Sequence, residues 1–172
     1  THHRSSFRRT PTAHPPPTMG DLLVALYRLE DLKTSPSGIV IRRPFAAEKH
    51  EVATWVDERF GTGWRGEAEI ALSQVPPTCF LALDEEKRLL GFACYDSSWK
   101  GFFGPTGVEE SARGRGIGTA LARRALSAMR EAGYAYAVIG ASGADEFYRA
   151  TFGAQPIVDS DPGPYEGRLQ SK

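Results

Sequence analysis

The sequence contains few cysteines and few histidines, and this excludes several kinds of site. The only cysteines among its 172 residues are Cys79 and Cys94. They are too few and too far apart in the sequence for a disulfide framework or a CxxC metal or redox site, so we expect buried thiols in a reduced compartment. Three of the four histidines, His2, His3 and His14, lie within the first 18 residues. A histidine-rich metal centre is therefore not expected.

The remaining histidine, His50, would have to serve any Ser-His-Asp or Cys-His catalytic site. It lies in an acidic segment, residues 46–60, whose apolar residues recur at helical spacing. A solvent-facing histidine on a helix is the simpler interpretation, and it disfavours hydrolases of these two kinds.

The chain also lacks a net charge and a long apolar run. Lysine and arginine total 21, as do aspartate and glutamate, so the broad positive field that drives nonspecific nucleic-acid binding is missing. No apolar run approaches the ~20 residues that cross a bilayer. The first residues also lack the apolar stretch of a secretory signal. We therefore expect no nucleic-acid partner, no membrane partner and a cytoplasmic location.

Composition divides the chain into a leader and one domain. Residues 1–18 are rich in proline and poor in apolar residues, so they cannot bury enough surface to fold alone. We expect them to be a disordered or added leader. Residues 19–172 fit a single domain, because domains usually run to ~100–200 residues.

Hydrophobic spacing predicts alternating strands and helices in that domain. Residues 21–29 and 39–43 are expected to form a hairpin or a paired edge. A proline inside a strand predicts a bulge or a late strand start at Pro105. Other strands are expected at 79–83, 89–95, up to Val108, at 134–139 and at 157–158, and helices at 46–60, 64–75, 117–133 and 144–152.

The segment with the clearest chemistry is the turn Arg113-Gly114-Arg115-Gly116-Ile117-Gly118, between a strand and an amphipathic helix. Its glycines permit positive φ, so several backbone N–H groups can point at one ligand. The start of the helix adds unpaired amides and the positive end of the helix dipole. A pyrophosphate suits this arrangement. Arg113 and Arg115 can also reach a 3′-phosphate, and Thr119 offers a hydroxyl.

Two other phosphate-binding turns fit less well. The P-loop needs a lysine followed by serine or threonine, which Ile117-Gly118-Thr119 does not supply. A dinucleotide-binding fold needs G-x-G-x-x-G early in the domain and an acidic residue ~20 positions later. Here the spacing is G-x-G-x-G, the turn comes late, and residues 138–141 contain no acid.

Two segments resemble the GNAT superfamily of N-acetyltransferases. Residues 108–121 look like its acetyl-CoA motif, R/Q-x-x-G-x-G/A, and residues 146–154 are similar to its tyrosine-containing helix and following aromatic-Gly turn. Topology extends the resemblance to about residues 38–160. It implies an α/β (α+β) fold with a mixed, mostly antiparallel sheet of about six to seven strands and about four flanking helices. It also implies acetyl transfer from acetyl-CoA to a primary amine of a small molecule or peptide.

The resemblance assigns cofactor contacts to individual positions. The backbone near Val108 would pair with the pantetheine arm, and the amides of residues 113–119 would hold the pyrophosphate. Tyr148 matches the tyrosine that protonates the departing thiolate, although a packing aromatic is the alternative. Ser142 stands near the place where many members have an asparagine that contacts CoA.

The acceptor side is less defined. Glu109 or Glu110 is expected to act as the base for direct attack by the amine, although Glu110 occupies a position where the family often has proline. Core packing is the alternative interpretation for the aromatic candidates. The expected acceptor contacts are Tyr95, Asp96, Trp99 and Tyr165.

Three alternatives stay open at this stage. The chain can be a noncatalytic acyl-CoA-binding sensor, a transferase of a longer acyl group, or one with a hydroxyl acceptor. Residues 21–29 can cap a sheet edge or pair with a second copy, which favours a homodimer.

Overall fold

The computed structural model describes residues 20–31, 34–140 and 142–170. The predicted leader, residues 1–18, lies outside these ranges. A seven-stranded sheet forms the centre, with strand order β2-β3-β4-β5-β6-β1-β7. All neighbouring strands run antiparallel except β5 and β6, which are parallel. The predicted mixed, mostly antiparallel sheet is confirmed.

The strands and helices follow the predicted order, with short 3-10 turns between some of them. The strands are β1 (Leu22–Ala25), β2 (Val40–Arg42), β3 (Cys79–Leu83), β4 (Leu89–Tyr95), β5 (Phe102–Val108), β6 (Tyr136–Ile139) and β7 (Gln155–Pro156). The helices are α1 (Lys49–Phe60), α2 (Thr62–Leu72), α3 (Ile117–Glu131) and α4 (Asp145–Phe152).

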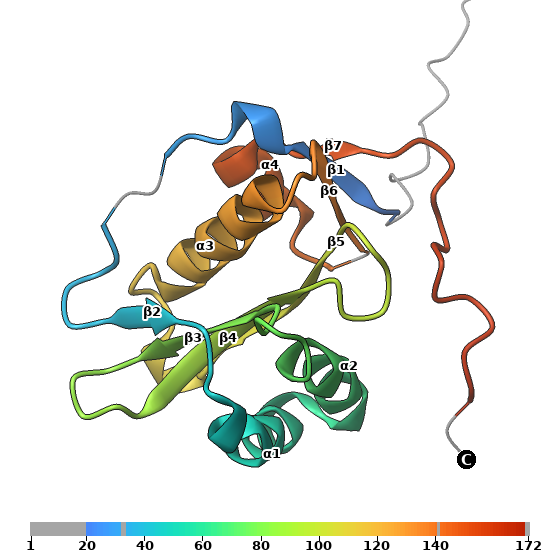
Figure 1. The fold of residues 1–172 in the computed structure, drawn as a ribbon. Coiled ribbons are helices and arrows are strands. Elements are labelled where there is room, and N and C mark those ends of the chain that lie inside the picture. Colours follow the sequence, from blue (N-terminus) through green and yellow to red (C-terminus); the bar gives the residue numbers. More distant parts are fainter. Residues whose placement is uncertain (1–19, 32–33, 141, 171–172) are drawn as a thin grey trace, which may run out of the picture.

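Helices cover both faces of the sheet (Figure 1). On one face α1 and α2 bury an apolar cluster that includes Val56, Ala68 and Phe92. On the other face α3 buries a larger cluster that includes Leu121 and Met129. Successive residues of a strand point to opposite faces, so the central strands must be apolar throughout. None of the helices in the described ranges is both long and apolar enough to cross a bilayer.

The first strand is shorter than predicted and pairs elsewhere. The run at 21–29 leaves the sheet after Ala25 and turns through a 3-10 helix at Leu26–Arg28. The predicted hairpin with residues 39–43 is wrong, because β1 lies between β6 and β7 whereas β2 pairs with β3. Leu22 and Val24 are buried in the α3-side core, and this distant packing decides the pairing.

Two other strand predictions changed in detail. The terminal strand falls at Gln155–Pro156 instead of 157–158. Pro105 lies inside β5, so the strand does not start late, but the register against β4 shifts between Ala93 and Tyr95. The bulge is thus confirmed. Proline has no N–H to donate, and a bulge leaves such a residue unpaired.

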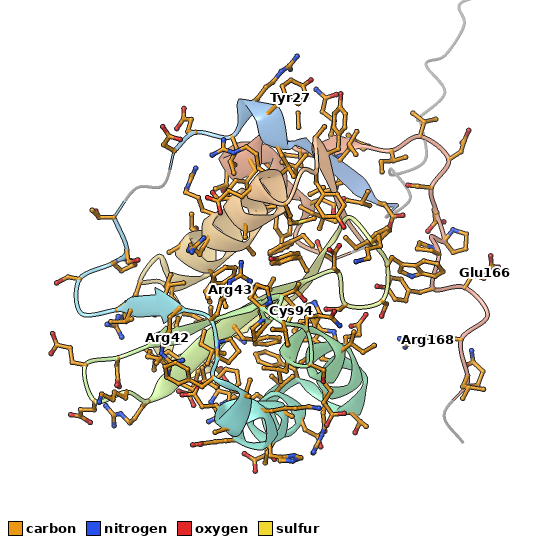
Figure 2. All side chains as sticks on the ribbon, in the orientation of Figure 1. Tyr27, Arg42, Arg43, Cys94, Glu166 and Arg168 are labelled. Atoms are coloured by element: carbon orange, nitrogen blue, oxygen red, sulfur yellow. The ribbon has the colours of Figure 1, made fainter. Side chains whose placement is uncertain are left out.

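The two cysteines meet although they are distant in sequence. Cys79 on β3 lies directly opposite Cys94 on β4, and both are fully buried free thiols. Cys94 lies in the layer between the sheet and α2 (Figure 2). Buried thiols were predicted, whereas their adjacency was not. The predicted solvent-facing position of His50, on α1, is also confirmed.

Candidate cofactor and acceptor sites

The sheet divides between β5 and β6. These parallel strands pair only at Phe102 with Val138 and at Phe103 with Ile139. Beyond these pairs no register joins them within the described residues, and we call this divergence the fork. It begins at the bulge around Pro105.

Backbone groups of β5 face into the fork. The Glu109 amide donates to the Leu90 carbonyl on β4 at 2.8 Å. Because backbone groups of alternate residues point to opposite edges of a strand, those of Thr106 and Val108 point away from β4. The Val108 carbonyl accepts a bond from Arg113 Nε at 3.2 Å. The edge of β5 is thus available to an extended ligand through its N–H groups.

The glycine-rich turn has the geometry of an anion site. Gly114 and Gly116 adopt φ of 81° and 79°, in the left-handed region that favours glycine. Gly116 caps the start of α3, and the first amide bonded back to it is that of Ala120, at 3.1 Å. No acceptor among the described residues takes a hydrogen bond from the amides of residues 114–119. The amide of Arg113, in contrast, donates to the Glu110 carbonyl at 3.3 Å.

A cavity of about 680 Å³ adjoins this turn. Its volume falls within the range of small-molecule pockets, ~300–1,000 Å³. Arg115, Arg123 and Arg124 make no ion pair with any carboxylate in the described part of the chain. The cavity therefore suits an anionic ligand with an apolar part. Its lining comprises Thr34, Ser35, Pro36, Ile41, Arg115, Gly116, Thr119, Ala120, Arg123 and Arg124.

Tyr148 lies on α4, beside the base of the fork. Its side chain is only 4% exposed, and its ring packs edge-on against Phe103 with centroids 6.0 Å apart. The hydroxyl makes no hydrogen bond within the described ranges. Burial raises the pKa of Tyr148 to about 12, which keeps the phenol protonated near neutral pH. The ring packs like a core aromatic while the hydroxyl keeps its proton to donate.

The two predicted bases lie in different surroundings. The Glu109 carboxylate accepts bonds from Arg59 Nη2 at 2.8 Å and Nε at 3.2 Å. The Arg59 guanidinium lies over the Trp55 ring, 4.4 Å from its centroid. Glu110 is exposed in the 3-10 turn before the glycine-rich turn. Neither carboxylate is buried.

Two of the predicted acceptor contacts, Tyr95 and Asp96, form hydrogen bonds within the protein. Tyr95 is buried, and its hydroxyl accepts a bond from Arg43 Nη1 at 3.2 Å. Figure 2 shows where Arg43 leaves the end of β2. Asp96 accepts bonds from the Tyr134 hydroxyl and the Gly101 amide, each at 2.8 Å. These bonds shape the loop between β4 and β5.

The other two acceptor candidates, Trp99 and Tyr165, pack against each other. The rings of Trp99 and Tyr165 form a T-shaped pair with centroids 6.4 Å apart, and both rings are partly exposed. Ser142 has a local role, because its Oγ accepts a bond from the Ala144 amide at 3.0 Å near the start of α4. Its predicted contact with a cofactor stays a prediction.

Sequence reasoning missed several residues that border these sites. Arg123 and Arg124 lie in the predicted helix 117–133 but were not assigned to a site, and the cavity wall from residues 34–36 comes from a distant turn. Glu67 on α2 accepts a bond from the Ser98 hydroxyl at 3.2 Å near Tyr165. A single acid on an amphipathic helix carries no sequence pattern that predicts this neighbourhood.

Solved structures with the same fold come from several organisms. A GCN5-related N-acetyltransferase from Sphaerobacter thermophilus has a TM-score of 0.61 at 20% identity, over 79% of this chain and 47% of that one. One from Kribbella flavida has a TM-score of 0.56 at 19% identity, over 88% and 60%. A tandem GNAT protein from the clavulanic acid pathway has a TM-score of 0.57 at 17% identity, over 80% and 50%. The chain thus spans about half the length of these proteins.

A comparison with curated proteins found no match. The sequence model described as the Acetyltransferase (GNAT) family matches residues 45–154. This stretch contains α1 through α4, the glycine-rich turn and Tyr148. It covers more than half of the chain. The resemblance seen in the sequence is therefore confirmed, and the chain belongs to the GNAT family of acetyltransferases.

Proposed function

We propose that this protein transfers an acetyl group from acetyl-CoA to a primary amine of a small molecule or peptide. Family and fold support acyl transfer. The observation that carries the finer proposal is the set of amides at residues 114–119 that find no acceptor among the described residues, next to a cavity with three arginines that no described carboxylate pairs with. Backbone amides at a helix start hold a diphosphate, and arginines hold a further phosphate.

The cofactor's parts have matching partners. The amides of residues 114–119 hold the diphosphate, and Arg115 of the same turn also lines the cavity that takes the nucleotide. The outward N–H groups of Thr106 and Val108 pair with the amide-bearing arm. This arrangement delivers the thioester to the fork, near Tyr148.

The chemistry needs few groups from the protein. Acetyl-CoA supplies an activated acyl group. The chain aligns the amine, donates an N–H to the developing oxyanion near Val108, and protonates the departing thiolate from Tyr148. Trp99 and Tyr165 give the acceptor an aromatic wall, which suits an apolar or amphipathic amine. Glu109 and Glu110 are the bases predicted from sequence, and the pairing of Glu109 with Arg59 counts against it.

The proposal is tested by calorimetry and by CoA release. Titration of the full chain with acetyl-CoA should give one site per chain. A panel of primary amines, from ethylamine to tryptamine and a lysine peptide, should include amines that accelerate CoA release, with the acetylated product seen by mass spectrometry. Tight binding without turnover would instead indicate a sensor. Turnover only with longer acyl-CoAs or with alcohols would indicate one of the other transferases.

A further inference from the structure

Three distant segments meet beside the fork, on the α2 face of the sheet. The Ser98 hydroxyl, in the loop between β4 and β5, donates to Glu67 Oε1 on α2 at 3.2 Å. The Tyr165 ring, from the C-terminal segment, packs against Trp99 of the same loop with centroids 6.4 Å apart, and the Glu67 charge helps to raise the pKa of the Tyr165 hydroxyl. Glu67, Ser98 and Tyr165 thus form one polar group, which we call the Glu67 cluster.

The C-terminal segment is fixed to the sheet before it reaches this cluster. The Ile157 amide donates to the Asp21 carbonyl at 2.9 Å, and the Asp21 amide donates to Ser160 Oγ at 2.8 Å. Figure 1 shows the segment leaving β7 and running down the side of the molecule past α2, and Figure 2 shows Glu166 and Arg168 along its outer course. These contacts hold the C-terminal segment to β1 as far as Ser160.

Tyr165 reaches the base of the fork. Its ring lies edge-on to Phe102, with centroids 6.4 Å apart, and a methyl group added to Gly140 would lie 3.8 Å from it. Gly140 is the residue at which the chain leaves β6. Neighbouring residues of a strand point to opposite faces, and Phe103 packs against Tyr148. Tyr165 and Tyr148 thus approach the fork from opposite faces of the sheet.

Two other carboxylates near the fork already have partners. Glu109 is paired with Arg59, and Asp96 accepts two hydrogen bonds within its own neighbourhood. Glu67 forms no ion pair with any described residue, so no basic side chain among them occupies its carboxylate.

We propose that Glu67 and Tyr165 form the proton-accepting pair of the acceptor site, with Ser98 holding the Glu67 carboxylate in place. This inference rests on the proposed amine acetylation. As nitrogen bonds to the acetyl carbon, an N–H proton passes to the Tyr165 oxygen, and the phenol's own proton passes to Glu67. The carbon–sulfur bond breaks, and Tyr148 gives the thiolate a proton. Water then reprotonates Tyr148 and deprotonates Glu67, so amine and thioester become amide and thiol.

The surroundings of the cluster favour a relayed proton. Burial, followed by the charge and hydrogen bonding of Glu67, raises the pKa of Tyr165 to about 12. The phenol therefore stays protonated at neutral pH, and it relays a proton by giving up its own as it accepts another. Two further titratable groups interact with the cluster, Asp21 just before β1 and the thiol of Cys94 on β4.

The test compares Glu67→Gln with Glu69→Gln, a matched change on the same helix. Glu69 pairs with Arg65 in a partly exposed i,i+4 ion pair. With the best amine of the panel, Glu67→Gln should lower kcat/KM about 100-fold and remove the acid limb of its pH profile, because general bases contribute ~10²–10⁴-fold. Tyr165→Phe should lower kcat/KM about tenfold. Glu69→Gln should keep both rate and limb.

Two results overturn the inference. One is a wild-type rate and acid limb in Glu67→Gln. The other is a slower Glu67→Gln with an unchanged limb, which assigns Glu67 a structural role only. Melting temperature and calorimetric affinity for acetyl-CoA identify misfolded variants, and Ser98→Ala then reports the cluster with a smaller perturbation. If the wild-type chain itself binds no acetyl-CoA or acetylates no amine, the proposed function fails and not merely this inference.

Discussion

The cofactor side and the acceptor side of the fork are formed by different kinds of chemical groups. The cofactor side uses backbone amides of one continuous turn, residues 113–119, held open by two left-handed glycines. The acceptor side uses side chains from α2, the β4–β5 loop and the C-terminal segment, joined at Glu67, Ser98 and Tyr165. A site made of backbone groups tolerates most side-chain substitutions. In a site made of side chains, a substitution changes the groups that contact the ligand. We therefore expect the cofactor to be a general property of the fold and the acceptor a property of this chain.

The largest effect should come from a side chain in the backbone site. Gly116→Val should raise the dissociation constant for acetyl-CoA about 100-fold, because a β-branched residue strains at φ of 79° and blocks close approach of phosphates. Gly133→Val is the matched control. It places the same side chain at φ of 102°, beyond the other end of α3, and should lose stability without losing affinity. Calorimetry measures the affinity for acetyl-CoA and thermal melting measures stability. Equal affinities of the Gly116→Val and Gly133→Val variants would contradict a cofactor site made of backbone amides.

The next effect should appear where the two sides meet. Tyr148→Phe should lower kcat about 10–100-fold with an unchanged affinity for acetyl-CoA, since only the general acid is removed. The protonated phenol is the active form, and its pKa of about 12 lies above its ordinary value. Tyr148 therefore should cause no fall in wild-type kcat between about pH 6 and about pH 10. If wild-type kcat falls with rising pH in this range and the fall is lost in Tyr148→Phe, the pKa of Tyr148 is lower than about 12.

A smaller change should distinguish the cavity from the turn. Arg115→Ala should weaken CoA binding about tenfold, because a charge-assisted bond contributes about 1.5–3 kcal/mol. It should weaken dephospho-CoA binding much less if the arginine holds the 3′-phosphate. Arg28→Ala, after β1 at the opposite end of the sheet, should leave both affinities unchanged. Equal losses for the two ligands would assign Arg115 to the diphosphate instead.

The smallest effect is expected at Glu109. Glu109→Gln should change kcat/KM less than about threefold and the free energy of unfolding by under about 1 kcal/mol, because a partly exposed ion pair contributes little. Steady-state rates and urea unfolding measure both. A fall comparable to that of Glu67→Gln would restore Glu109 as the base and make the acceptor side, like the cofactor side, local in sequence.

Local sequence was sufficient for the parts whose physics is local. The turn at 113–118 was predicted because glycine spacing, a preceding strand and a following amphipathic helix are adjacent in the chain. The bulge at Pro105 was predicted because proline lacks an N–H. In each case the residues that determine the structure lie within a few positions of one another.

Pairings between distant segments could not be predicted in the same way. Nothing near Leu22 indicates that its partner is Ile139 instead of the run at 39–43. Likewise, Glu67 and Tyr165 are ordinary residues until the fold brings them together. The cavity wall of Arg123 and Arg124 was hidden for a related reason, because a helix pattern separates buried from exposed faces but does not distinguish a cavity from bulk solvent.

The place of β1 has a consequence for the order in which the sheet assembles. This strand lies outside the stretch matched by the family, residues 45–154, yet it is hydrogen-bonded on both edges, to β6 and β7. β1 can take its place between β6 and β7 only after those two strands have formed. The residues of β1 are translated long before those of β6 and β7, so this part of the sheet forms last. Closure over so long a separation in sequence is slow. Trimming the chain to the family boundaries would leave the edge of β6 bare and prone to aggregate.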